Sequence, residues 1–181
     1  MTVLRFCRND GDHPTVANAG IIPARIEAMD NNADFGAHLF PGESPWDAIY
    51  DTLWVSHREF WLVAGTGPGP NIMTAIPEGD TIACNGEAVG IPTLSEGRVS
   101  VALSVWEGPA PDGQGSFLGT GQINVSDREL SLLNVEGREP GPVLTLEEEG
   151  QHEVRVWRAA ARSSDGAELF DVRIWPCPTS A

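Results

Sequence analysis

Apolar and polar residues alternate most clearly in the second half of the chain. Along residues 97–108, GRVSVALSVWEG, aliphatic residues at every second position face one side. The other side carries Ser100, Ala102, Ser104 and Trp106. Shorter segments of the same kind follow, separated by Gly, Pro and Asp, at 121–127, 128–137, 142–150, 151–159 and 168–177. Short alternating segments between turn residues predict a mostly β protein, an antiparallel β-sandwich or an open barrel.

The first half of the chain alternates less regularly. Six further strands are expected there, the last three on weaker patterns, at residues 2–7, 21–29, 35–40, 58–65, 71–76 and 80–84. No change of composition or linker divides the chain, so residues 1–181 are expected to form a single domain.

One stretch, SPWDAIYDTLWVS, follows a period of about 3.6 residues instead. Its large apolar residues fall on one helical face at Trp46, Ile49, Tyr50, Leu53 and Trp54. Ser44 is a suitable N-cap and Pro45 suits the first helical position. The pattern therefore predicts one short amphipathic helix over about residues 45–55, packed on a sheet.

Two nearly identical four-residue motifs lie close to the C-terminus, VRVW at 154–157 and VRIW at 172–175. Ser164-Asp165-Gly166 between them is a good three-residue turn, with Gly in the left-handed position. A hairpin folded there would place Val156 opposite Ile174, and Ala160 opposite Phe170, on one side of the sheet.

The other side of this hairpin would carry two crossed pairs of Arg and Trp. The pairs are Arg155 with Trp175, and Trp157 with Arg173. A guanidinium lying over an indole stabilises such a pair, so register pinning is the leading interpretation. The alternative is a recognition patch, which Trp106 would extend, because Trp and Arg dominate binding hot spots.

The composition and the charge exclude several classes of function. All 11 basic residues are arginine, so no phosphate-binding, Schiff-base or nucleophilic lysine is possible. Lysine replaced by arginine, with 20 Gly and 14 Pro, is typical of a high-GC bacterial genome. The net charge of −15 disfavours nucleic acid as a partner. It favours either simple solubility or docking on a basic protein.

The segment LEEEGQHE at 146–153 concentrates part of this acidity between two predicted strands. Its carboxylates are Glu147, Glu148 and Glu149. Such a segment is either a solvated hairpin tip or a contact for the basic side chains of a partner. The Arg–Trp residues and these three glutamates are the candidate binding residues.

No motif for catalysis, a metal or a cofactor rises above coincidence. The glycines of GTGPGP are interrupted by prolines. DNNADFG at 30–36 has the acidic spacing of a calcium loop, but Phe35 stands where such a loop needs glycine, and Pro41 where it needs glutamate. His57 and Glu59 share a parity and form a weak candidate acid–base pair. The cysteines, Cys7, Cys84 and Cys177, are too widely spaced for a zinc site.

The N-terminal residues lack the apolar run of a signal peptide, and no stretch of eighteen apolar residues suggests a membrane span. The sequence therefore predicts a cytoplasmic protein with reduced thiols and no membrane association.

The C-terminal run 144–178 resembles the ending of a group of small, mostly uncharacterised actinobacterial proteins. The matching residues are Gly150, His152, Val154, Arg155, Val156, Ile174, Trp175 and Pro176. More faintly, the alternating strands resemble the β-sandwich of competence-type nuclease inhibitors, acidic proteins that block a partner nuclease. These resemblances imply a β-sandwich.

Together the patterns predict a non-enzymatic acidic binding protein of the inhibitor or immunity type, docking on a basic protein. A β-sandwich module that binds a small molecule or a carbohydrate through its tryptophans is the second hypothesis. An enzyme built from dispersed carboxylates and His57 is the third.

Overall fold

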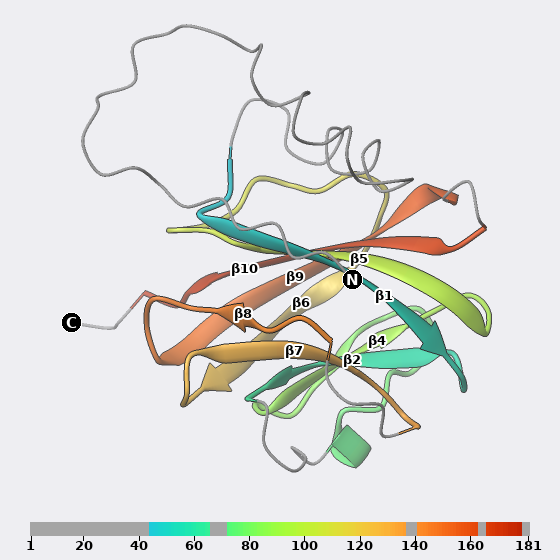
Figure 1. Ribbon diagram of the computed structural model, residues 1–181, viewed down its shortest axis with the longest axis horizontal. Helices are drawn as coiled ribbons and strands as arrows, with labels where there is room; N and C mark the ends of the chain where they lie inside the picture. The colour runs from blue at the N-terminus through green and yellow to red at the C-terminus, as the bar shows by residue number, and fades with distance from the viewer. Residues whose placement is uncertain (1–43, 66–71, 137–140, 163–165, 179–181) are drawn as a thin grey trace, which may run out of the picture.

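The computed structural model describes residues 44–65, 72–136, 141–162 and 166–178, and it shows two facing β-sheets (Figure 1). The predicted β-sandwich is confirmed, and the sheets do not close into a barrel. The first sheet has the strand order β1-β5-β10-β9-β6, and the second has the order β3-β4-β2-β7-β8. The strands are β1 (Asp47–Val55), β2 (Glu59–Ala64), β3 (Ala83–Cys84), β4 (Ala88–Pro92), β5 (Gly97–Val105), β6 (Ser116–Val125), β7 (Glu129–Asn134), β8 (Leu144–Thr145), β9 (Gly150–Arg162) and β10 (Glu168–Pro176).

Neighbouring strands are antiparallel with one exception, because β10 pairs with β5 in parallel. Along one side of the sandwich, the segment before β4 joins the two sheets. The amide of Ile82 donates to the carbonyl of Leu118 at 3.2 Å, and the amide of Asn124 donates to Gly86 at 2.7 Å. These bonds tie the β3 edge of the second sheet to β6 of the first.

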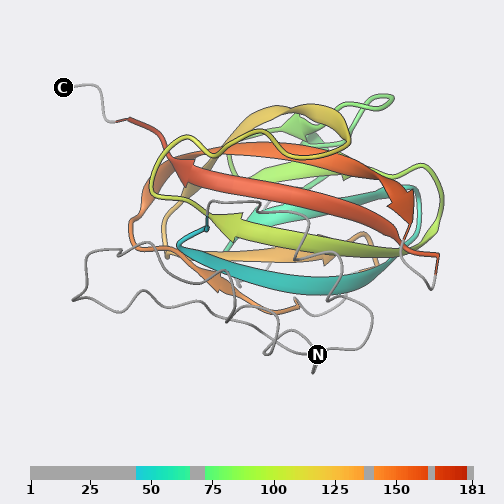
Figure 2. The ribbon, with the colours of Figure 1, turned by 90° about the horizontal axis from the view of Figure 1, so that it is seen from above.

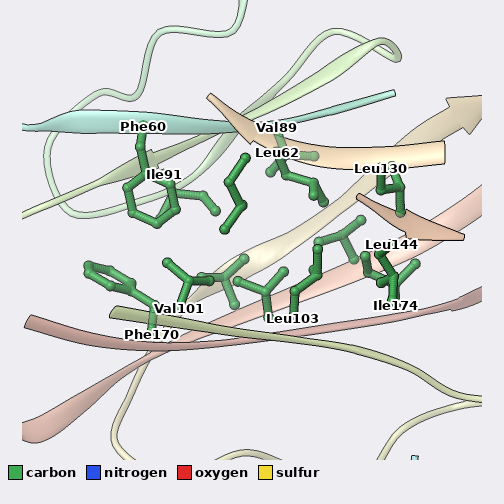
Figure 3. Close-up of a cluster of buried hydrophobic side chains, with 14 of the residues drawn as sticks. Phe60, Leu62, Val89, Ile91, Val101, Leu103, Leu130, Leu144, Phe170 and Ile174 are labelled. Carbon is green, nitrogen blue, oxygen red and sulfur yellow. The ribbon is translucent and has the colours of Figure 1, made fainter. Parts of the chain in front are cut away.

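The core lies between the sheets and is aliphatic with an aromatic contact at one end (Figure 3). Phe60 of β2 meets Phe170 of β10 edge to face, with ring centroids 5.1 Å apart. The alternation predicted along residues 97–108 is confirmed, because every second residue of β5 enters this core. These residues are Val99, Val101, Leu103 and Val105.

The helix predicted over residues 45–55 is wrong, because β1 occupies this stretch. It pairs with β5 along its whole length, from Asp47 opposite Val105 to Val55 opposite Gly97. The apolar residues satisfy both periods, since Ile49, Leu53 and Val55 also alternate and enter the core. Two aspartates of the same parity concealed the alternation, and they are buried at Asp47 and Asp51.

Both aspartates bond to the backbone of β1 itself. The amide of Ala48 donates to Oδ1 of Asp47 at 2.9 Å, and the amide of Thr52 donates to Oδ1 of Asp51 at 2.8 Å. A short polar side chain that satisfies its neighbour's amide can be buried in an edge strand at reduced cost. The long ladder with β5 therefore outweighs the local helical spacing.

The predicted hairpin of β9 and β10 exists, but its register is shifted by two residues. Glu168 lies opposite Arg162 as predicted, and a bulge between Glu168 and Phe170 then changes the pairing. Phe170 lies opposite Arg158 rather than Ala160, and Val172 rather than Ile174 lies opposite Val156. A shift by two residues preserves the parity, so each side chain stays on its predicted face.

Other segments differ in detail. In the predicted strand 71–76, the described residues 72–76 form no strand, and Ile72–Thr74 is instead a short 3-10 helix, η1. Only Ala83–Cys84 of the segment 80–84 is a strand. Several predictions fall outside the described residues: the strands at 2–7, 21–29 and 35–40, the loop at 30–36, Cys7, most of GTGPGP, and the first two residues of the 164–166 turn.

Gly90 of β4 lies where the sheet admits no side chain. It pairs with Trp61 of β2, whose indole Nε1 donates to the carbonyl of Ala75 at 2.9 Å. A Cβ added to Gly90 would lie 1.9 Å from that carbonyl oxygen. We expect Gly90→Ala to lower the free energy of unfolding by about 1–3 kcal/mol through overpacking.

Chemical denaturation of the two variants Gly90→Ala and Gly108→Ala would measure this effect. Gly108 is the matched control because its added Cβ meets nothing within 4 Å. Equal stability of both variants would show that the Ala75 carbonyl does not hold its position over β4.

Candidate functional site

The loop between β5 and β6 covers the outer face of the first sheet. Because β10 and β9 lie between β5 and β6, the chain must cross both strands to connect them. It does so over the outer face, as the loop of residues 106–115 shows in two views (Figures 1 and 2). We call Trp106 at the start of this loop, together with the residues beneath it, the Arg–Trp face. The residues beneath the loop are Arg155, Trp157, Arg173 and Trp175.

Arg173 is at the centre of the Arg–Trp face and is only 1% exposed. Its Nε and Nη2 donate to Oδ2 of Asp171 at 2.9 and 2.7 Å, and its Nη1 donates to the carbonyl of Pro111 at 2.8 Å. The guanidinium carbon lies 5.4 Å from the ring centroids of both Trp106 and Trp157. The buried cation is thus satisfied by charge, hydrogen bonds and ring faces together.

Arg155 is the more accessible arginine, with a side chain 31% exposed. Its guanidinium lies 5.0 Å from the ring centroid of Trp175 and contacts Glu153 at 3.2 Å and Asp112 of the loop at 3.7 Å. The predicted contacts of Arg155 with Trp175, and of Arg173 with Trp157, are therefore present. They run diagonally, because the shifted register places Arg155 directly opposite Arg173.

The loop packs against the Arg–Trp face without a gap. Ala110 forms a small apolar cluster with Trp106 and Trp175. A Cβ on Gly113 would lie 2.6 Å from Cδ2 of Trp157, so the loop approaches as closely as glycine permits. With Trp157 and Trp175 less than 10% exposed, a partner cannot contact their indoles while the loop lies there. This geometry favours the interpretation that the repeated VRVW and VRIW motifs fix the register of the hairpin.

Asp171 is the buried partner of Arg173, and burial raises the pKa of its carboxyl while Arg173 opposes the rise. Tyr50 of β1 lies in the same cross-strand row, separated from Asp171 by Ala102. Burial, together with the charge of Asp171, raises the pKa of Tyr50 to about 12. The ionisable groups of Asp171 and Tyr50 are therefore largely shielded from water.

A cavity of about 110 Å³ lies at the end of the sandwich where β5 and β10 end and β9 begins. It combines two sets of predicted residues, since it contains Trp106 from the Arg–Trp face together with part of the acidic turn. We call it the end cavity. Its lining residues are Trp46, Val105, Trp106, Glu107, Leu146, Glu147, Glu148, His152 and Pro176.

The acidic turn lies between β8 and β9 as predicted, and all three of its glutamates are exposed. Glu147 and Glu148 line the end cavity. Glu149 instead approaches Arg128, with Oε1 at 3.7 Å from its Nε. Within the described part of the chain, neither Glu147 nor Glu148 forms an ion pair.

His152 forms part of the wall of the end cavity and is 2% exposed. Its Nδ1 lies 3.1 Å from the carbonyl of Gly150, which only accepts, so this nitrogen carries the proton. Burial lowers the pKa of His152, and the Gly150 carbonyl and the charge of Glu148 oppose the change. The neutral ring leaves Nε2 as an acceptor, and among the described residues this atom has no hydrogen-bond partner.

Three polar or aromatic residues of the end cavity were not among the sequence candidates. Trp46 was assigned to the helix, and Glu107 was hidden in the loop after the predicted strand. His152 belonged to the acidic segment 146–153 and was not considered as a buried residue. Its parity with Val154 and Val156, both in the core, was the available signal.

The remaining candidates do not converge on a chemical site. His57 is exposed in the turn between β1 and β2, where its φ is 63°, and burial raises the pKa of Glu59. Cys84 and Cys177 are free thiols. Among the described residues, no three His, Cys, Asp or Glu side chains are close enough to hold a metal ion. No helix in the described ranges has the length and apolarity needed to cross a membrane.

The fold and the end cavity define a two-sheet β protein with an acidic, aromatic-walled opening at one end. No family model matches the sequence, and no curated protein matches it significantly. Two solved structures share the fold. The chain is similar to ComJ from Bacillus subtilis, described as an inhibitor of the DNA-degrading activity of NucA, with a TM-score of 0.53 and 12% identity over 71% of this chain and 95% of that one.

The second structure is the product of crocagin biosynthetic gene J, with a TM-score of 0.51 and 12% identity over 71% of this chain and 96% of that one. At this identity the likeness concerns the fold. It confirms the resemblance to the competence-type inhibitor sandwich, whereas the resemblance to actinobacterial proteins stays a prediction.

Proposed function

We propose that this chain is a non-enzymatic inhibitor-type protein of the cytoplasm that binds a basic protein partner through the end of its sandwich. The observation that carries the proposal is the end cavity, where Glu147 and Glu148 stand exposed beside a neutral histidine and two indoles. Acidic groups at an opening attract a basic partner over a long range, and a chain with a net charge of −15 strengthens this attraction.

The fold supports the kind of partner to test first. ComJ, which has the same two-sheet arrangement, is described as an inhibitor of a DNA-degrading protein. Enzymes that act on DNA need basic surfaces for its phosphates, and an acidic protein can occupy such a surface in place of the nucleic acid. A basic nuclease is therefore the first class of partner for this chain.

A carbohydrate-binding role depends on exposed tryptophans. Of the six tryptophans, Trp157 and Trp175 lie under the loop, Trp61 and Trp106 are less than 10% exposed, and Trp46 is half-buried. Trp54 is the one with a mostly exposed side chain. A row of indoles on which sugar rings could stack is therefore not present on this sandwich, and protein binding is the function that the geometry supports best.

Retention of basic proteins by the immobilised chain at different salt concentrations tests the proposal. We expect a basic partner to be retained at 50 mM salt, and its affinity to fall at least tenfold at roughly 500 mM because salt screens the attraction. The variant Glu147→Gln/Glu148→Gln should lose most of this retention, and Glu78→Gln, an exposed acid on another loop, should keep it. The proposal would be contradicted if retention were the same at both salt concentrations and the same for the double variant as for the unmodified chain.

A further inference from the structure

We propose that the end cavity binds the side chain of a single arginine from the partner. This inference rests on the proposed function and names the group that the site recognises. It follows from the cavity's volume, its acceptors and its aromatic walls.

The volume suits one side-chain head rather than a whole ligand. By this measure one water needs on the order of 10–15 Å³, so a cavity of about 110 Å³ has room for several waters or for one planar head group. Pockets for drug-sized ligands are several times larger, roughly 300–1,000 Å³. The cavity therefore fits a side chain that projects from a protein surface.

The polar groups around the cavity favour a ligand that only donates. The lining includes the exposed carboxylates of Glu147 and Glu148, and it includes His152, whose neutral ring offers Nε2 as an acceptor. This ring is buried and its Nε2 is unpartnered among the described residues, so a donor in the cavity would satisfy it. An anion would instead be repelled by the charges of Glu147 and Glu148.

The aromatic walls favour arginine over lysine. Trp46 and Trp106 line the cavity, and a planar guanidinium stacks on indoles while donating in its plane to carboxylates. The protein already uses this arrangement, since Arg173 lies 5.4 Å from the ring centroids of Trp106 and Trp157 and binds Asp171. Trp106 thus has one buried arginine near its ring and also borders the cavity.

The test titrates the isotopically labelled full chain with N-acetyl-arginine methylamide and follows its NMR shifts. N-acetyl-citrulline methylamide, which has nearly the same shape without the charge, is the matched control probe, and the lysine analogue is the second. We expect saturable shifts at Glu107, Glu148 and His152 with the arginine probe. We expect at least fivefold weaker binding of the lysine probe and no saturable shifts with citrulline.

Variants decide whether the cavity is responsible. Glu148→Gln changes an exposed side chain and should weaken the arginine probe at least fivefold, whereas Glu78→Gln should leave its binding unchanged. Equal binding of the arginine and citrulline probes, shifts centred away from the cavity, or an unaffected Glu148→Gln would overturn the inference. Lysine binding as tight as arginine would overturn the choice of arginine.

The outcomes also separate this inference from the proposed function. A partner that is still retained in a salt-dependent manner by variants without arginine-probe binding would overturn the inference alone. Arginine-probe binding without any retained basic protein would overturn the proposed function instead.

Discussion

Replacing Arg173 by Met is expected to lower the free energy of unfolding by about 3–5 kcal/mol at neutral pH, because it leaves the Asp171 carboxylate buried without its cation. Asp171 is 1% exposed, and its Oδ2 receives both of the short bonds from Arg173. Its other oxygen, Oδ1, has no hydrogen-bond partner among the described residues. Urea denaturation of the variant and the unmodified chain measures the loss.

The pH dependence of this variant shows whether the lost stability comes from the unpaired buried carboxylate of Asp171 or from the lost packing of the Arg173 side chain. Burial already raises the pKa of Asp171, and removal of Arg173 raises it further. An acid with a raised pKa in the folded state binds its proton more tightly than in the unfolded chain, so the variant should regain stability as the pH falls through that pKa. Arg173→Met/Asp171→Asn should recover stability at neutral pH. A loss that neither acid nor Asp171→Asn relieves would contradict this account.

Truncating Phe170 to Ala is expected to cost about 3–5 kcal/mol, because it opens a cavity between the two sheets. The ring is fully buried and contacts Phe60 of the facing sheet edge to face (Figure 3). Thermal or chemical unfolding measures the change.

Phe117→Ala is the matched control for this substitution, since that ring is 55% exposed on β6. Its truncation should change the free energy of unfolding by less than about 1 kcal/mol. Similar losses for the two substitutions would mean that the contact between the sheets does not hold the core together.

The fold class was predictable because the aliphatic residues alternate along the strands. In β5, Val99, Val101 and Leu103 enter the core at every second position, and nothing local competes with the strand. In β1, Asp47 and Asp51 stand at positions that alternation reserves for apolar residues, so the helical period seemed the better fit. Only pairing with β5, a long-range contact, shows that the strand is preferred.

The Arg–Trp contacts were predictable from parity, but their register and burial were not. The bulge after Glu168 moves the pairing by two residues without changing any face. The loop 106–115 covers the Arg–Trp face because of the strand order. Since β6 lies beyond β10 and β9, the chain from β5 must cross both strands to reach it. Strand order is set by tertiary packing, and the loop sequence gives no local signal of it.

The sequence predicted the acidic residues of the end cavity but not its aromatic ones. Glu147 and Glu148 were evident as an acidic turn between strands. Their proximity to Trp46 and Trp106 depends on how the ends of separate strands meet. The local sequence pattern therefore predicted the negative charge of the site, but the shape of the cavity depends on the tertiary fold.

Amide hydrogen exchange of the full chain, alone and bound to the basic protein that it retains, tests the central claim most directly. The account predicts that binding slows exchange in the β8–β9 turn and at the end of β5, around Glu107, Glu148 and His152. It predicts no change in β10 beneath the loop. Protection centred on the outer face of β2 and β7, or around the exposed Trp54, would contradict it.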